Sequence, residues 1–282
     1  MVIRELLGRT VCALADNGVE NARFEAEQIL GKAGIPRMKL LTEPRESVAD
    51  DTERAAAELL RRRLTGYPLQ YLLGEWEFFG LPFEVGEGVL IPRQDTETLA
   101  ELARDILLGR GRDERRTADL CAGSGCIGIT LAKLCGAEVT AVELSEAAFG
   151  YLERNIALNG TAESVRAVRG DVLDGGAAEK LGEYDLIVSN PPYLNDTDMK
   201  NLQAEVTYEP EMALYGGSDG LDFYRKMLAV WTKRLKDNGV FAVEIGAGQE
   251  RGVTEIFAEN ALSAECIKDT RGIYRVVYGV KK

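Results

Sequence analysis

After Arg116 the chain alternates between short apolar segments with β-type residues and longer segments with helix-type periodicity, and this alternation constrains the fold most. It predicts strands at 118–120, 138–142, 165–168, 184–189 and 240–245, interleaved with helices at 125–134, 146–159, 222–235 and 250–260. Two closing strands are predicted at 264–267 and 274–278. We therefore expect an α/β fold with a doubly wound, mostly parallel sheet.

The first 73 residues have a different pattern. Apolar side chains from Ile3 to Leu14 recur every three or four residues, which predicts a helix with one buried face. Further helices are predicted at 24–30, 38–41 and 52–64, the last ending in a solvated run at Arg61–Arg63. Aromatic residues and glycines from Glu75 to Ile91 then predict hairpin strands. We expect a helical domain at 1–73, a β-hairpin linker at 74–92 and an α/β domain at 93–282.

The composition narrows the possible functions. Acidic residues outnumber basic ones 46 to 34, which argues against a partner held through phosphates, so no direct nucleic-acid binding is expected. There is no histidine, and no pair of the five cysteines has C-x-x-C spacing, so we expect no metal site and no Ser-His or Cys-His nucleophile. No apolar run approaches about 18 residues and no signal peptide is evident, which predicts a cytoplasmic protein with no membrane contact.

A glycine-rich loop joins the first strand of the predicted sheet to its first helix. Gly123, Gly125 and Gly128 match the pattern G-x-G-x-x-G, which NAD-binding proteins also use. Glu143 ends the next strand, where a carboxylate can bind both ribose hydroxyls of NAD or S-adenosylmethionine. Asp171 follows the third strand, within reach of an adenine amino group. These features indicate an adenosine cofactor and leave both candidates open.

The fourth strand ends in Ser189-Asn190-Pro191-Pro192-Tyr193. Proline has no backbone N–H for a sheet ladder and holds the preceding residue extended, so the strand must stop near Asn190. This leaves an amide side chain and fixed carbonyl groups at the cofactor end of the sheet. Hydride transfer requires nothing of this kind, which favours S-adenosylmethionine, although a proline-terminated strand can also have no function.

Ordered motifs along almost the whole chain then point to one family. Through these motifs the chain resembles class I S-adenosylmethionine-dependent methyltransferases and, more narrowly, the PrmC/HemK family. That family methylates the amide nitrogen (N5) of the glutamine in the Gly-Gly-Gln loop of peptide chain release factors. The motifs are Arg63-Leu-Thr-Gly66-Tyr-Pro68, Glu77-Phe78-Phe79-Gly80, Leu90-Ile-Pro-Arg93-Gln-Asp95-Thr96-Glu97, Asp119 to Gly125, Asn190 to Tyr193, Glu209-Pro210 and Gly216-Gly217-Ser-Asp219-Gly220.

The resemblance implies a class I methyltransferase sheet with an antiparallel last strand, a five-helix N-terminal domain that recognises the substrate, and a hairpin linker. It implies S-adenosyl-L-methionine as cofactor, S-adenosyl-L-homocysteine as product, no metal, and release factors as protein substrates. We expect a monomer, although the sequence does not determine the oligomeric state. Asn190 and the Pro191 carbonyl would hold the glutamine amide for direct displacement. The implied substrate site is Leu90, Arg93, Asn190, Pro191, Pro192 and Tyr193, and the implied cofactor site is Cys121, Ala122, Gly123, Ser124, Gly125, Glu143, Asp171, Val172 and Asn190.

The chain departs from the family pattern at four places. Cys121 stands where glycine is usual, Glu143 where aspartate is commoner, and Gln94 where proline is usual. The segment Gly272-Ile-Tyr-Arg275 replaces Gly-Arg-Asp-Arg, which leaves the role of the tail open.

Three other functions stay open at this point. A ribosomal-protein glutamine methyltransferase shares the cofactor loop and Asn-Pro-Pro-Tyr. An adenine-N6 nucleic-acid methyltransferase uses a similar tetrapeptide, and the acidic composition argues against it. A non-catalytic binding module would be expected to lose Asn190 or the glycine loop, and both are intact.

Overall fold

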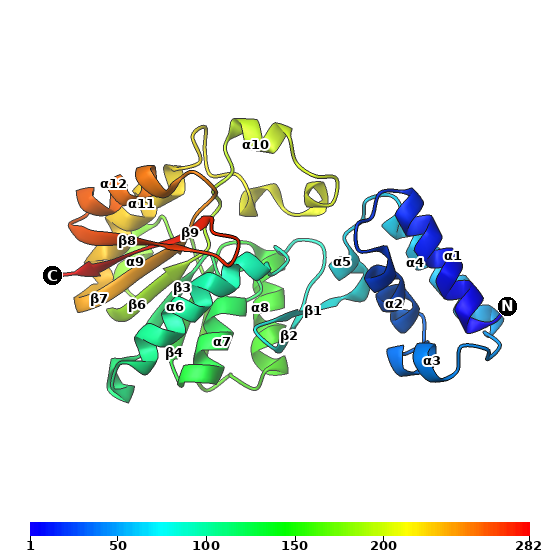
Figure 1. The fold of residues 1–282 in the computed structure, drawn as a ribbon. Coiled ribbons are helices and arrows are strands. Elements are labelled where there is room, and N and C mark those ends of the chain that lie inside the picture. The colour runs from blue at the N-terminus through cyan, green and yellow to red at the C-terminus, as the bar shows by residue number, and fades with distance from the viewer. The chain divides into compact units, whose positions relative to one another are not determined.

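The computed structural model describes all 282 residues, which divide into two compact units (Figure 1). The helical unit contains Met1–Glu75 together with the short segment Gln203–Tyr208. The α/β unit contains Trp76–Leu202 and Glu209–Lys282. The chain therefore leaves the α/β unit once, over 203–208, to contribute to the helical unit. None of the helices is both long and apolar enough to cross a membrane.

The helical unit is built on α1 (Ile3–Asp16), α2 (Ala22–Lys32), α3 (Arg37–Thr42), α4 (Asp50–Arg63) and α5 (Leu69–Leu73). The four helices predicted from periodicity are present. The fifth, α5, has only five residues between Pro68 and Gly74, too few to show a repeat. Leu14 and Leu30 are fully buried where α1 packs on α2.

Arg63 corrects one expectation about the last turn of α4. The run Arg61–Arg63 was predicted to be solvated, but the Arg63 side chain is only 5% exposed. Its guanidinium pairs with Glu25 at 2.6 Å and with Glu205 at 2.5 Å. A buried cation needs such partners, so Arg63 holds the segment Gln203–Tyr208 within the helical unit.

The α/β unit contains a seven-stranded sheet, and only its last strand runs antiparallel to the others. This arrangement confirms the predicted doubly wound sheet. Because β4 and β5 lie on one side of β3 and β6 on the other, the sheet has a switch point between β3 and β6, where ligands bind in such folds. The strand order is β5 (Val165–Arg169), β4 (Glu138–Glu143), β3 (Arg116–Leu120), β6 (Tyr184–Ser189), β7 (Leu235–Glu244), β9 (Tyr274–Lys281) and β8 (Leu262–Lys268).

Helices cover both faces of this sheet (Figure 1). One face carries α6 (Glu97–Leu108), α7 (Cys126–Cys135) and α8 (Glu146–Leu158), and the other carries α9 (Gly175–Glu179), α11 (Asp222–Trp231) and α12 (Glu250–Glu259). Every residue of β6 is buried for this reason, which explains its continuous apolar run.

Two segments differ in detail from the prediction. The hairpin strands β1 (Glu75–Phe78) and β2 (Leu81–Glu84) are joined by a tight turn, but no strand continues from 85 to 91. Instead Asn155 of α8 accepts a 2.6 Å hydrogen bond from the Glu84 N–H, and the chain beyond it runs irregularly along the α/β unit. The predicted loop 193–220 contains the short helix α10 (Asp196–Lys200), which Asn195 caps.

Candidate active site

A pocket of about 890 Å³, including its part open to solvent, lies at the carboxyl ends of β3, β4, β5 and β6. All of its lining residues belong to the α/β unit. A largely apolar wall with a few polar groups is typical of small-molecule sites. The lining consists of Gly88, Leu90–Arg93, Thr96, Cys121–Ser124, Cys126, Ile127, Glu143–Ser145, Ala148, Asp171, Val172, Asn190, Pro192, Pro210, Met212, Ala213 and Phe223.

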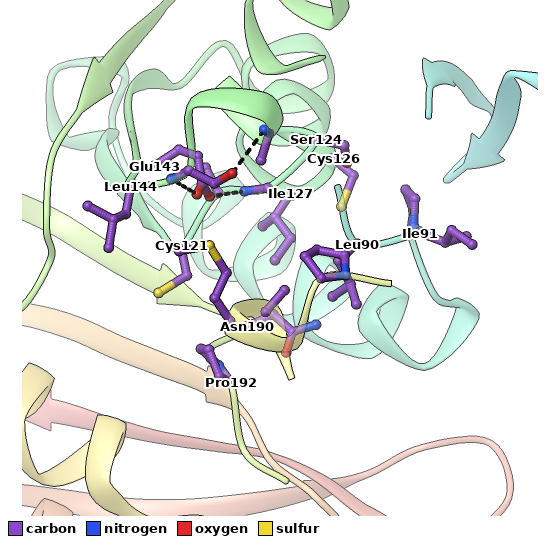
Figure 2. A pocket seen from close by; sticks show the side chains of 18 of the residues that line it. Leu90, Ile91, Cys121, Ser124, Cys126, Ile127, Glu143, Leu144, Asn190 and Pro192 are labelled. Atoms are coloured by element: carbon purple, nitrogen blue, oxygen red, sulfur yellow. Dashed lines mark hydrogen bonds between the residues drawn. The ribbon is translucent and has the colours of Figure 1, made fainter. Parts of the chain in front are cut away.

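The structure brings together most of the residues singled out from the sequence. Leu90, Arg93, Cys121 to Ser124, Glu143, Asp171, Val172, Asn190 and Pro192 all line this one pocket. Figure 2 shows Leu90, Cys121, Ser124, Glu143, Asn190 and Pro192 around it. Gly125, Pro191 and Tyr193 do not line it. Parallel strands end at the same sheet edge, which explains why residues from four separate strands meet here.

Gly125 is needed for packing. Its φ of 81° is left-handed, and it starts α7. A Cβ there would lie 2.5 Å from Leu152 Cδ1 and 2.9 Å from Ile129 Cδ1, both far inside normal contact. A Cβ on Gly128 would likewise come within 2.9 Å of Asp119 Oδ2, the atom that accepts the Gly128 N–H. The glycine pattern thus lets α7 pack closely.

Cys121 also has a left-handed backbone, with a φ of 57°. Glycine adopts this conformation without strain, which gives a physical reason for glycine at this position in the family pattern. Burial raises the pKa of the Cys121 thiol well above its usual value and that of Cys126 to about 12. A raised pKa favours the neutral thiol, which argues against either cysteine as a nucleophile.

Glu143 is the only acidic residue of the pocket lining that is almost completely buried, at 8% exposure. Its Oε2 accepts the Gly123 N–H at 2.8 Å, and its Oε1 accepts the Ser145 N–H at 2.7 Å (Figure 2). Burial raises the pKa of Glu143, and the backbone N–H groups of Ser145, Gly123 and Leu144 oppose that rise. Each oxygen keeps a lone pair for a ligand hydroxyl, so the carboxylate can bind a diol such as a ribose.

Asp171 and Val172 have different environments. Asp171 is exposed, and its Oδ1 accepts the Leu173 N–H at 2.8 Å, a turn-forming bond that leaves Oδ2 available. Val172 is buried, and its carbonyl accepts the Trp231 indole N–H at 2.7 Å. Trp231 thereby fixes the apolar Val172 side chain as part of the pocket wall.

Asn190 lines the pocket, whereas Tyr193 of the same Asn-Pro-Pro-Tyr segment does not. The Asn190 Nδ2 donates to the Thr96 hydroxyl at 3.2 Å, within the pocket lining. The Tyr193 hydroxyl instead donates to Glu244 Oε1 at 3.3 Å, and the Tyr193 carbonyl accepts from Gln249 at 2.9 Å. Tyr193 belongs to the implied substrate site, but it is not among the residues that line the pocket.

Glu209 was part of a motif but had been given no role. Its carboxylate, whose side chain is 1% exposed, accepts the Ile91 N–H at 3.0 Å and pairs with the Arg93 guanidinium. Glu209 therefore holds the segment Leu90–Arg93 against the pocket. The apolar lining residues Ile127, Leu144, Met212 and Phe223 were also missed, because nothing in a linear sequence separates them from core residues.

The C-terminal segment supports the same region from another side. Arg275 pairs with Asp95 and with Asp269, each at 3.3 Å, and Arg271 also pairs with Asp95. The divergent tail therefore anchors the start of α6. No group of three or more cysteine, histidine or acidic side chains is arranged to hold a metal ion.

Comparison with known proteins adds the family. The model for the PrmC N-terminal domain matches residues 5–74, and that for the methyltransferase small domain matches residues 99–217. A methyltransferase structure from Pyrococcus furiosus has a TM-score of 0.54 at 22% identity, covering 82% of this chain and 98% of that chain, which shows a shared fold.

Two curated relatives extend the match over the whole chain. A release factor glutamine methyltransferase of Geobacter sulfurreducens is 41% identical, covering 98% of this chain and 96% of its own length. One of Fusobacterium nucleatum is 37% identical, covering 98% of this chain and 78% of its own. Since this identity spans both units as well as the pocket, the chain is a methyltransferase and belongs to the release factor glutamine methyltransferase family.

Proposed function

We propose that this enzyme transfers a methyl group from S-adenosyl-L-methionine to the side-chain amide nitrogen of the glutamine in the Gly-Gly-Gln loop of peptide chain release factors. The observation that carries the proposal is the single pocket that contains both Glu143 and Asn190. The Glu143 carboxylate is suited to bind the ribose hydroxyls of the cofactor, and the Asn190 side chain is suited to bind the glutamine amide. The names of the relatives agree with this reaction.

The pocket fits the cofactor in three respects. The Glu143 carboxylate has two oxygens with one backbone bond each, ready for the two ribose hydroxyls. Val172 and Leu144 supply apolar surface for the adenine, and Asp171 Oδ2 is available to its amino group. The loop from Cys121 to Ser124 provides the wall for the methionine part. When bound, S-adenosylmethionine supplies an electrophilic methyl group.

The task of the protein is then to orient a weak nucleophile. An amide nitrogen has its lone pair delocalised into the carbonyl, so it reacts only when held in line with the methyl group. Asn190 Oδ1 and the Pro191 carbonyl would each accept one amide N–H of the glutamine. Fixing two reactants in this way can lower the activation barrier by roughly 7 to 11 kcal/mol. No general base is needed before attack, and the pocket offers no histidine or thiolate as one.

The same acceptors would select against glutamate. A carboxylate has no N–H to donate, so the two carbonyl oxygens would be left unpaired beside a negative charge, at a cost of about 1 to 3 kcal/mol each. We also propose that the helical unit recognises the release factor. The relatives match across this unit as well as the α/β unit, which favours a release factor over a ribosomal protein as substrate.

The experiment is methyl transfer from labelled S-adenosylmethionine to a purified release factor. The matched control is the same release factor with Ala in place of the loop glutamine. We expect label only on the factor that keeps the glutamine. Equal labelling of both, or labelling of neither, would refute the proposed substrate.

A further inference from the structure

Thr96 lies in the pocket lining immediately before α6, and its side chain is 2% exposed. Residues at this place often cap a helix through a hydroxyl, but Thr96 makes no such capping bond. Its hydroxyl instead accepts the 3.2 Å hydrogen bond from Asn190 Nδ2. The buried Thr96 hydroxyl is thus bonded to Asn190, the side chain on which the proposed reaction depends, and does not cap α6.

This bond determines which end of the Asn190 amide faces the substrate. An asparagine side chain has a donor end, its NH₂ group, and an acceptor end, its carbonyl oxygen, and the two occupy similar space. With Nδ2 bonded to Thr96, Oδ1 is the end left for a ligand. Turned over, Asn190 would present N–H groups, which suit a carboxylate and repel the N–H groups of a glutamine.

Glu244, at the end of β7, is a second buried polar group near Thr96. Its side chain is 1% exposed, its Oε1 accepts the Tyr193 hydroxyl, and its Oε2 is buried with no hydrogen-bond partner. An interaction with the Thr96 side chain lowers the pKa of Glu244, which places the two side chains near each other. A hydroxyl has one hydrogen and two lone pairs, so its oxygen can accept from Asn190 while its hydrogen faces a carboxylate.

The network behind Glu244 is well anchored. Arg275 donates to the Ile245 carbonyl at 3.3 Å and pairs with Asp269 and Asp95. The Tyr224 hydroxyl donates to the Glu244 carbonyl at 2.8 Å. These bonds hold the end of β7, and with it Glu244, in place.

We propose that Thr96 is a positioning residue that orients the Asn190 amide with its oxygen toward the substrate and thereby enforces glutamine over glutamate. This inference rests on the proposed function. It predicts a defect that loss of packing alone would not produce, namely a change in the choice between an amide and a carboxylate.

The test uses Thr96→Val, which keeps the shape of the side chain and removes the hydroxyl. The loop-glutamine release factor and its Gln→Glu variant are titrated into the enzyme saturated with S-adenosylhomocysteine, at about pH 8, where the Glu244 carboxyl, with its pKa of about 7, is ionised. We expect the affinity ratio of glutamine to glutamate to fall roughly tenfold or more in Thr96→Val, with turnover lowered by a similar factor. Thr96→Ser, which restores the hydroxyl, should recover most of both.

Thr130→Val is the matched control. Thr130 is buried in α7, its hydroxyl has no hydrogen-bond partner, and it does not line the pocket, so this change should leave the ratio and the turnover as they are. An unchanged ratio in Thr96→Val overturns the inference, whether or not turnover falls. A wild-type enzyme that methylates the factor but does not prefer glutamine in the titration refutes the amide clamp itself, and one that labels no factor refutes the proposed function.

Discussion

The two ends of α7 offer a direct test of what the glycine loop does. Both ends are glycines with left-handed backbones, Gly125 at a φ of 81° and Gly136 at a φ of 63°. They differ in surroundings. A Cβ on Gly125 would meet Leu152 at 2.5 Å and Ile129 at 2.9 Å, whereas a Cβ on Gly136 would meet nothing within 4 Å. The Gly136 backbone, with a ψ of 36°, lies in the left-handed region that alanine can adopt, whereas the Gly125 backbone, with a ψ of 11°, lies outside it. Alanine at Gly125 therefore carries at least the backbone strain of alanine at Gly136, together with a larger steric cost.

The magnitudes follow from this difference. The left-handed conformation costs an alanine about 1 to 2 kcal/mol, and the restriction of the unfolded chain returns about 0.4 to 1 kcal/mol, so Gly136→Ala should be mildly destabilising. Gly125→Ala adds overpacking, which costs roughly 1 to 3 kcal/mol in a well-packed core. Gly125→Ala should thus be the less stable variant by about 1 to 3 kcal/mol, which corresponds to several degrees in Tm, at roughly 2 to 4 °C per kcal/mol.

Urea unfolding followed by tryptophan fluorescence measures this quantity, because both tryptophans, Trp76 and Trp231, belong to the α/β unit. Titration with S-adenosylmethionine provides the second measurement. Equal loss of stability in the two variants would contradict the packing role of Gly125. A large loss of cofactor affinity in Gly125→Ala without extra destabilisation would show that Gly125 acts on the cofactor directly.

Three further predictions address the pocket. Asn190→Ala should abolish methyl transfer and keep most cofactor affinity, and unchanged turnover would exclude its role. Glu143→Ala should weaken cofactor binding at least roughly tenfold, because it removes the proposed ribose partner and the acceptor of two backbone N–H groups. If calorimetry gave the variant the cofactor affinity of the wild type, this role would be contradicted. Burial raises the pKa of Glu244 from 4.5 to about 7, and the negative charge of Asp95 adds to this rise. Arg275 and the Thr96 and Tyr193 hydroxyls lower the pKa but do not cancel the effect of burial. The folded state then binds the Glu244 proton more tightly than the unfolded state does. This proton binding stabilises the fold at acid pH, and the stabilisation is lost as the pH rises to about 7. Relative to Glu244→Gln, the wild type should gain about 2 to 3 kcal/mol of unfolding free energy between about pH 8 and about pH 5, and no such gain in urea titrations would refute the assignment.

Some buried interactions could not be predicted because they join residues far apart in the chain. Arg63 was expected at a solvated helix end, yet its partners Glu25 and Glu205 are 38 and 142 residues away. Glu209 holds Ile91 across 118 residues. Side-chain pairing of this kind is set by how the elements pack, and no local periodicity records it. The position of Tyr193 away from the pocket lining was missed for the same reason, since its partner Glu244 ends a different strand.

The sequence by itself determined the sheet architecture and the group of residues at its carboxyl edge. Apolar periodicity, glycines and prolines are local properties, and in a parallel sheet they suffice to place Asn190, Glu143 and the glycine loop at one edge. Only the tertiary structure decided what each residue does there. It assigned Gly125 to helix packing, bonded the Tyr193 hydroxyl to Glu244 outside the pocket lining and placed the Thr96 hydroxyl beside the Asn190 amide. These roles depend on distances of a few ångströms between elements, which burial and directional hydrogen bonds establish only once the chain has folded.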